Sequence, residues 1–166
     1  MIWGMTASTF TLVHVWLSVI GIGAGLVVVF GLLAGKSLGG WTALFLITTA
    51  ATSVTGFAFP FDHLLPSHKV GIVSLAVLAL VLLARYGFRI AGPWRRVYAA
   101  GAGLALYLNV FVAVVQAFEK VPFLNAMAPT QTEPAFVVTQ VVVLALFTVL
   151  TIGAARRFRK APVRPA

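Results

Sequence analysis

Five long apolar stretches, separated by short polar gaps, constrain this chain more than any other feature. A helix needs about 20 mostly apolar residues to cross the hydrocarbon core of a bilayer, because each residue adds about 1.5 Å of rise. The five stretches are Thr9–Ala34, Gly40–Phe59, His68–Ala84, Val97–Phe118 and Ala135–Ala155. Only 9% of the residues are charged, whereas a soluble domain carries roughly a quarter. The sequence therefore predicts an all-α fold, a polytopic bundle of five transmembrane helices.

The gaps between these stretches are too short to hold a second domain. The longest, Glu119–Pro134, has about 16 residues and could not bury a core of its own. Within it two prolines bracket Phe123, Leu124 and Met127, which predicts one short helical turn at the membrane interface or over the end of the bundle. We expect Arg85 to end the third stretch. Residues 1–166 are thus predicted to form one transmembrane domain, with 156–166 as a basic tail.

The basic residues predict the orientation of the bundle. Of the 12 Lys and Arg residues, all but Lys69 and Lys120 fall in gaps on one side, and Asp62, Glu119 and Glu133 all fall on the other. The positive-inside rule then places the tail in the cytoplasm and the N-terminus outside. This topology accounts for the net charge of +9 without a nucleic-acid partner. The tail is also suited to anionic lipid headgroups.

Several function classes lose support from residues that the sequence lacks. There is no cysteine, which excludes a disulfide framework, a thiolate metal site and a catalytic thiol. Apart from Lys69 at the start of the third helix, no Asp, Glu, Lys or Arg lies inside the predicted helices, so the charged pathway of many transporters is missing. Hydrolase motifs are absent as well. A non-enzymatic protein is therefore favoured, and a channel would require an oligomer.

Glycines at one-turn spacing mark a close-packing face on the first helix. They are Gly21, Gly25, Gly31 and Gly35. Small residues at this spacing let two helix backbones approach each other in a membrane. Packing inside the bundle is the simpler explanation of this face and a homo-oligomer interface is the alternative, and the sequence does not separate them. An unidentified membrane partner is also compatible with the sequence.

Polar residues inside the apolar stretches outline a candidate pocket. Thr48, Thr52 and Thr55 share one face of the second helix, and their hydroxyls either bond to the preceding turn or line a polar seam. Amides in lipid need partners, and Asn109, Gln116 and Gln140 lie on other helices. We place Gln116 and Gln140 in the outer half of the membrane and Asn109 near its middle.

All three histidines lie toward the outer side. His14 is inside the first helix, and His63 and His68 lie with Asp62 in or beside the second gap. Imidazoles and a carboxylate could ligate a metal, and two imidazoles on facing helices could hold a b-type haem. A histidine near the interface can also be satisfied by water or one carbonyl. Three hypotheses stay open: a small-molecule or accessory protein with an outer polar pocket, a haem or metal redox protein, and an oligomeric channel.

The chain also resembles a known group of sequences. The run Ala51-Thr52-Ser53-Val54-Thr55-Gly56-Phe57-Ala58-Phe59-Pro60-Phe61-Asp62-His63-Leu64-Leu65-Pro66-Ser67-His68 and the run Ala128-Pro129-Thr130-Gln131-Thr132-Glu133-Pro134 are similar to those of small bacterial inner-membrane proteins of unknown function. The resemblance implies a bacterial cytoplasmic membrane. It implies no activity, cofactor or site residue.

Overall fold

The computed structural model describes residues 1–59 and 66–160, and the secondary-structure elements in these ranges are all helices. The elements are α1 (Ala7–Leu33), α2 (Gly39–Gly56), α3 (Pro66–Leu82), the π-helical turn η1 (Leu83–Gly87), α4 (Trp94–Lys120), α5 (Pro122–Met127) and α6 (Pro134–Lys160). The predicted all-α fold is confirmed. Each of the five apolar stretches is helical, with ends that differ from the prediction by a few residues.

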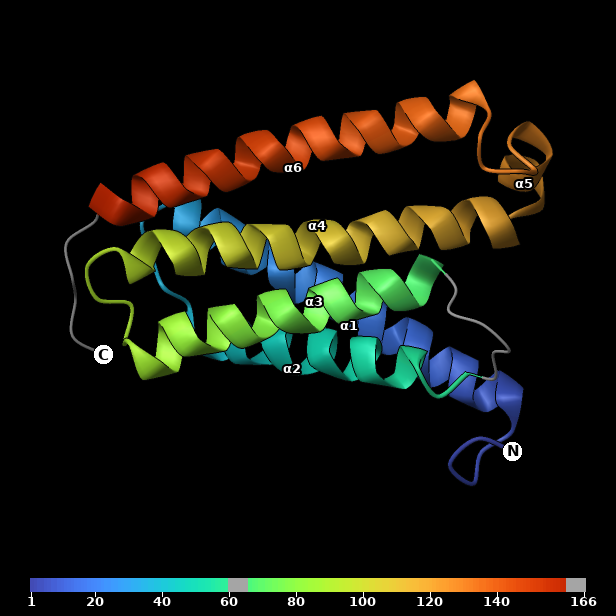
Figure 1. Ribbon diagram of the computed structural model, residues 1–166, viewed down its shortest axis with the longest axis horizontal. Coiled ribbons are helices and arrows are strands. Elements are labelled where there is room, and N and C mark those ends of the chain that lie inside the picture. Colours follow the sequence, from blue (N-terminus) through green and yellow to red (C-terminus); the bar gives the residue numbers. More distant parts are fainter. Residues whose placement is uncertain (60–65, 161–166) are drawn as a thin grey trace.

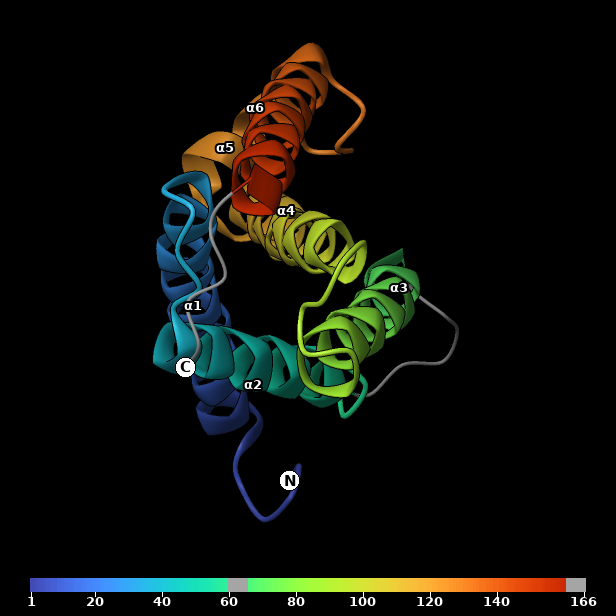
Figure 2. The same ribbon diagram turned by 90° about the vertical axis from the view of Figure 1, so that its left-hand side faces the viewer.

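The long helices run side by side in alternating directions (Figure 1). Helix α4 lies centrally and contacts α1, α3 and α6, while α2 packs against α1 and α3 (Figure 2). Two ends of the bundle can therefore be named. The histidine end holds the start of α1, the end of α2, the start of α3 and helix α5. The arginine end holds η1, the start of α4 and the end of α6.

Four of these helices are long and apolar enough to cross a membrane. They are Ala7–Leu33, His68–Gly87, Trp94–Lys120 and Pro134–Arg159. This indicates a membrane protein. Helix α2, with 18 residues, is long enough but is not among the four, because its glycines and hydroxyl side chains lower its mean hydropathy.

Arg85 does not end the third helix, contrary to our expectation. The chain continues through it as the π-helical turn η1. The Arg85 guanidinium donates to Ser37 Oγ at 3.0 Å and to Tyr98 Oη at 3.4 Å. These partners come from neighbouring segments, so the guanidinium of the half-buried Arg85 is held against the bundle while the helix continues. After η1 the backbone turns sharply through Arg89 and Ile90, both with positive φ.

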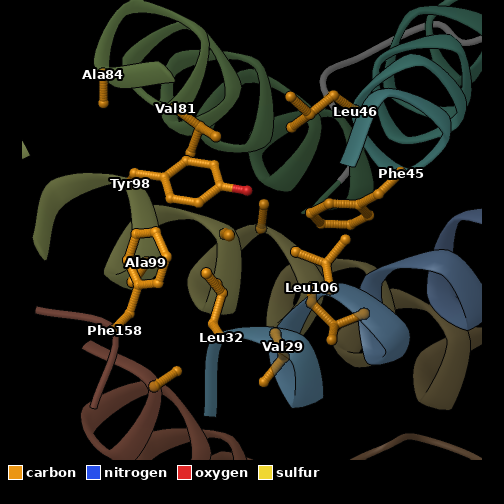
Figure 3. Packing of buried hydrophobic residues seen from close by; sticks show 14 of the residues in the cluster. Val29, Leu32, Phe45, Leu46, Val81, Ala84, Tyr98, Ala99, Leu106 and Phe158 are labelled. Atoms are coloured by element: carbon orange, nitrogen blue, oxygen red, sulfur yellow. The ribbon is translucent and has the colours of Figure 1, made fainter. Parts of the chain in front are cut away.

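Small residues explain how α4 occupies the centre. Its buried small residues are Ala99, Gly101, Ala102, Gly103 and Ala105. A Cβ added to Gly101 would lie 2.6 Å from Val81 Cγ2 on α3, and one added to Gly103 would collide with Thr151 on α6. Larger side chains would therefore push both neighbours away. Figure 3 shows the larger core residues around α4, with Phe45 of α2 pointing toward Leu106.

The predicted glycine face of α1 is used within the chain. A Cβ on Gly25 would lie 2.7 Å from Leu106 Cδ1 and 2.8 Å from Phe45 Cε2, and one on Gly31 would lie 2.7 Å from Leu38 Cδ1. Gly35 has a φ of +72° in the turn after α1. These contacts match the packing interpretation. The homo-oligomer alternative stays a prediction.

Candidate functional site

The hydroxyl side chains of α2 fall into two sets. Thr48, Thr52 and Ser53 donate to carbonyl oxygens one turn earlier, at 2.7, 2.9 and 2.9 Å. Such bonds satisfy a hydroxyl in lipid without any external partner. Ser53 also lies 3.3 Å from Ser74 Oγ on α3, whereas Thr42, Thr49 and Thr55 meet polar side chains on α1 and α4. We call these three residues and their partners the threonine seam.

The middle of the threonine seam joins α2 to α4. Asn109 Nδ2 donates to Thr49 Oγ1 at 3.1 Å, and the Asn109 side chain is only 8% exposed. A Cβ on Gly21 of α1 would lie 3.3 Å from both Asn109 Nδ2 and Thr49 Oγ1. Glycine therefore leaves room for this polar contact between three helices. We predicted Asn109 as pocket lining; in the structure its side chain is buried and makes a hydrogen bond between helices.

The arginine end of the seam is a second polar contact. The buried Thr42 Oγ1 lies 3.0 Å from Tyr98 Oη on α4. Tyr98 Oη also accepts from Arg85, and the guanidinium lies 5.5 Å from the centre of the Tyr98 ring. A hydroxyl, a phenol and a guanidinium thus connect α2, α4 and η1. This cluster was not predicted from the sequence, because we expected Arg85 to mark a helix boundary.

The histidine end of the seam places His14 against Thr55. His14 Nδ1 lies 2.8 Å from Thr55 Oγ1. The Thr55 hydroxyl lies 2.7 Å from the carbonyl oxygen of Ala51, which can only accept, so the hydroxyl proton is directed there. His14 Nδ1–H must then donate to Thr55. In the neutral ring Nε2 consequently carries the lone pair, and it has no hydrogen-bond partner among the described residues.

Aromatic rings surround this imidazole. The Phe59 ring lies edge-on to His14 with centroids 5.3 Å apart, and Phe10 packs against Phe59 at 5.1 Å. Gly56 also lies near the imidazole, because a Cβ added there would lie 3.8 Å from His14 Cε1. The ring is held in place on one edge by Thr55 and on one side by Phe59, while Nε2 bonds to none of the described residues.

His68 occupies a different position at the same end. It is 4% exposed, and its ring stacks on Phe57 with centroids 5.5 Å apart. Thr55 lies in the last turn of α2 and Phe57 directly follows the helix. Because the two residues are two positions apart, their side chains point in directions about 200° apart around the helix axis. The end of α2 therefore lies between the two imidazoles. This arrangement does not favour a haem held by His14 and His68 together.

The expected metal site has little support from the described residues. No group of three or more His, Asp or Glu side chains close enough to hold a metal ion occurs in residues 1–59 and 66–159. Asp62 and His63, the other two predicted ligands, lie outside the described residues. His14 and His68 alone do not make a metal centre.

The two predicted glutamines lie on α4 and α6, and not on the helices that carry His14, Thr55 and His68. Gln116 donates to Glu119 Oε2 at 3.3 Å on α4. Gln140 on α6 donates to the Phe111 carbonyl at 3.2 Å and lines an open, mostly apolar groove of about 290 Å³ with α4. No described hydrogen bond joins either glutamine to His14 or His68. The structure thus brings together His14 and Thr55 from the predicted pocket, but not Gln116 and Gln140.

Comparison with known proteins gives no identification. No family model, no curated protein and no solved structure matches this chain. The class defined by the fold is a helical membrane protein, and any function must be argued from the site.

Proposed function

We propose that this protein is a non-enzymatic, small-molecule-binding or accessory component of a bacterial cytoplasmic membrane, with its ligand site at the histidine end. The site is built on His14, whose Nε2 lone pair accepts a hydrogen bond from the ligand. The observation that supports it is the His14–Thr55 bond, which fixes the tautomer. A ligand with one O–H or N–H donor and an apolar body fits an imidazole beside Phe10 and Phe59.

A membrane position strengthens this proposal. The neighbours of His14 on α1 include the exposed Leu12, Val13 and Trp16. An imidazole within such a segment is costly unless it has a partner, and intramembrane ionisable residues are by default candidates for function. One nitrogen has its partner in Thr55. The other is the group left for a ligand.

The proposal includes five crossings, with the N-terminus outside. Helix α2 packs against α1 and α3 and runs opposite to both (Figures 1 and 2). Its hydroxyls are satisfied by backbone carbonyls or by other helices. A helix with no free polar group can lie in lipid even when its hydropathy is modest. The histidine end then faces the outside, and the arginine end faces the cytoplasm.

The binding site is tested by thermal-shift measurements on purified protein in mild detergent. A panel of small alcohols, phenols, amides and amines is measured against wild type, H14A, T55V and T52V. We expect some compounds to raise the melting temperature of wild type and of T52V, because Thr52 bonds only to the Thr48 carbonyl. The shift should vanish in H14A and shrink in T55V, where Nδ1 loses its acceptor.

Two results would count against the site. If H14A keeps every ligand-dependent shift, His14 is not the acceptor. If T52V loses the shifts as T55V does, the effect reports damage to α2 and not the imidazole. An absorption spectrum of the same preparation, air-oxidised and then reduced, tests the haem alternative, because a Soret band that moves on reduction would replace this proposal.

A further inference from the structure

Three arginines surround an open groove at the arginine end. Arg96 from the first turn of α4 and Arg156 and Arg159 from the last turns of α6 line it, with Ile152 and Ala155 forming the apolar part, and its volume is about 360 Å³. Arg156 and Arg159 share a face of α6 because they are three residues apart. We call this the arginine groove.

The three guanidinium groups have no anionic partner. Within residues 1–59 and 66–159, none of them makes a hydrogen bond or an ion pair, and all three side chains are exposed. The described acidic residues, Glu119 and Glu133, lie at the opposite end of the bundle. Like charges gathered around one groove repel each other unless an anion lies between them.

The position of Arg96 adds to this charge. It lies in the first turn of α4, where the helix dipole is positive and a cation is unfavourable. Arg95 beside it is placed over the Phe158 ring, with its guanidinium carbon 4.7 Å from the centroid. Arg96 has no such ring partner. The field at this end of α4 therefore favours an anion in the groove.

We propose that the arginine groove binds the phosphate of an anionic phospholipid. Guanidinium groups bind phosphate oxygens in pairs, and a free phosphate would offer the same chemistry. Two features favour the lipid. The groove lies where two apolar helices of membrane-spanning length end, which in the proposed topology is the level of the headgroups. Ile152 is 46% exposed beside the arginines, so an acyl chain can lie along α6 while the phosphate meets Arg96, Arg156 and Arg159.

Native mass spectrometry of the delipidated protein tests this proposal. The probes are phosphatidylglycerol and phosphatidylcholine with identical acyl chains, and the variants are R96Q, R156Q and R157Q. Arg157 is the matched control, because it is an exposed neighbour of Arg156 on the same helix but does not line the groove. We expect one phosphatidylglycerol to be retained by wild type and R157Q. Its affinity should fall about fivefold in R96Q and in R156Q.

Four results would overturn the proposal. Equal loss in R157Q and R156Q would show a diffuse basic surface. Equal retention of phosphatidylcholine would show that the groove does not distinguish lipids by headgroup charge. Displacement of phosphatidylglycerol by millimolar inorganic phosphate would assign the groove to a free anion. Unchanged affinity in both R96Q and R156Q, with unchanged helical circular dichroism, would show that the groove binds no phosphate at all.

Discussion

Single side chains in the threonine seam act as interhelical contacts and not merely as tolerated polar residues. The bond between Thr49 and Asn109 is buried and joins two helices that are far apart in the sequence. In a membrane such bonds average about 0.6 kcal/mol, with a maximum of about 1.7 kcal/mol. The polar seam therefore contributes to stability through pairs, and its loss should be measurable one pair at a time.

We expect T49V to lower the free energy of unfolding by about 1 kcal/mol, because it removes the acceptor of a buried amide. The measurement is an SDS titration in mixed micelles. T52V is the matched control, because its hydroxyl bonds only to the preceding turn, and it should stay close to wild type. A double-mutant cycle with N109L should show coupling, and additive losses would show that the two side chains do not interact.

We expect G25A to destabilise the bundle by about 1–3 kcal/mol, because overpacking forces neighbours to move. A methyl group at this position would lie within 3 Å of Leu106 and Phe45. G23A on the same helix meets nothing within 4 Å, so it should be neutral or slightly stabilising. If the same titration shows equal losses of unfolding free energy in G25A and G23A, Gly25 is not in a tight contact.

The sequence allowed some of these residues to be predicted, and not others. The glycine face could be predicted because spacing on one helix places residues on one side. The partner of Thr49 could not, since it depends on which faces of α2 and α4 meet. Arg96 and Arg156 likewise come together only because α4 and α6 are adjacent. Arg85 was misjudged because the sequence does not show that Ser37 and Tyr98 are within its reach.

At the scale of elements, the start of α6 is organised by one carboxylate. Glu133 accepts from the backbone N–H of Thr130 at 3.1 Å and of Thr132 at 3.0 Å, and from the Thr130 hydroxyl at 2.9 Å. Slight desolvation acts to raise the pKa of Glu133, but these hydrogen bonds outweigh it and hold the pKa below its ordinary value. Gln131 in the same turn donates to the Val115 carbonyl, which ties the turn to α4.

This depressed pKa predicts an acid-sensitive turn. The contribution of Glu133 is fully present above the ordinary carboxyl pKa of 4.5, and it is lost as the pH falls through the lower folded-state pKa. We expect the melting temperature of wild type to drop more than that of E133Q between about pH 6 and about pH 3.5. E119Q serves as the control. An identical acid response of E133Q and wild type would contradict the role of this carboxylate.

The elements themselves were predictable to within a few residues because the length of an apolar run and its polar flanks limit where a membrane helix begins and ends. The short helix α5 was expected from its two prolines and apolar spacing, and it is present. The π-helical turn was not expected. Arg85 within this turn bonds to Ser37 and Tyr98 on other segments, and the local sequence does not show these contacts.

For the whole molecule, the number of crossings has a direct test. The chain lacks cysteine, so single cysteines can be introduced and labelled without background. S37C precedes α2, and K69C lies near the start of α3. In intact cells, a membrane-impermeant maleimide should label K69C and not S37C, because α2 crosses between them. If both cysteines are labelled in lysed cells but show the same accessibility in intact cells, α2 does not cross and the bundle has four crossings.

The central position of α4 has a consequence for biosynthesis. Helices α1 to α3 leave the ribosome first, and at that stage Thr42 and Thr49 lack Tyr98 and Asn109, their partners in the finished protein. The first half of the chain is therefore an incomplete membrane domain. Two of its hydroxyls and its glycine surface lack their partners on α4 until that helix has been synthesised. Helix α4 supplies these partners when it inserts beside α1 and α3, and α6 then packs onto α4. We therefore expect the bundle to assemble outward from α4 once α4 has been made.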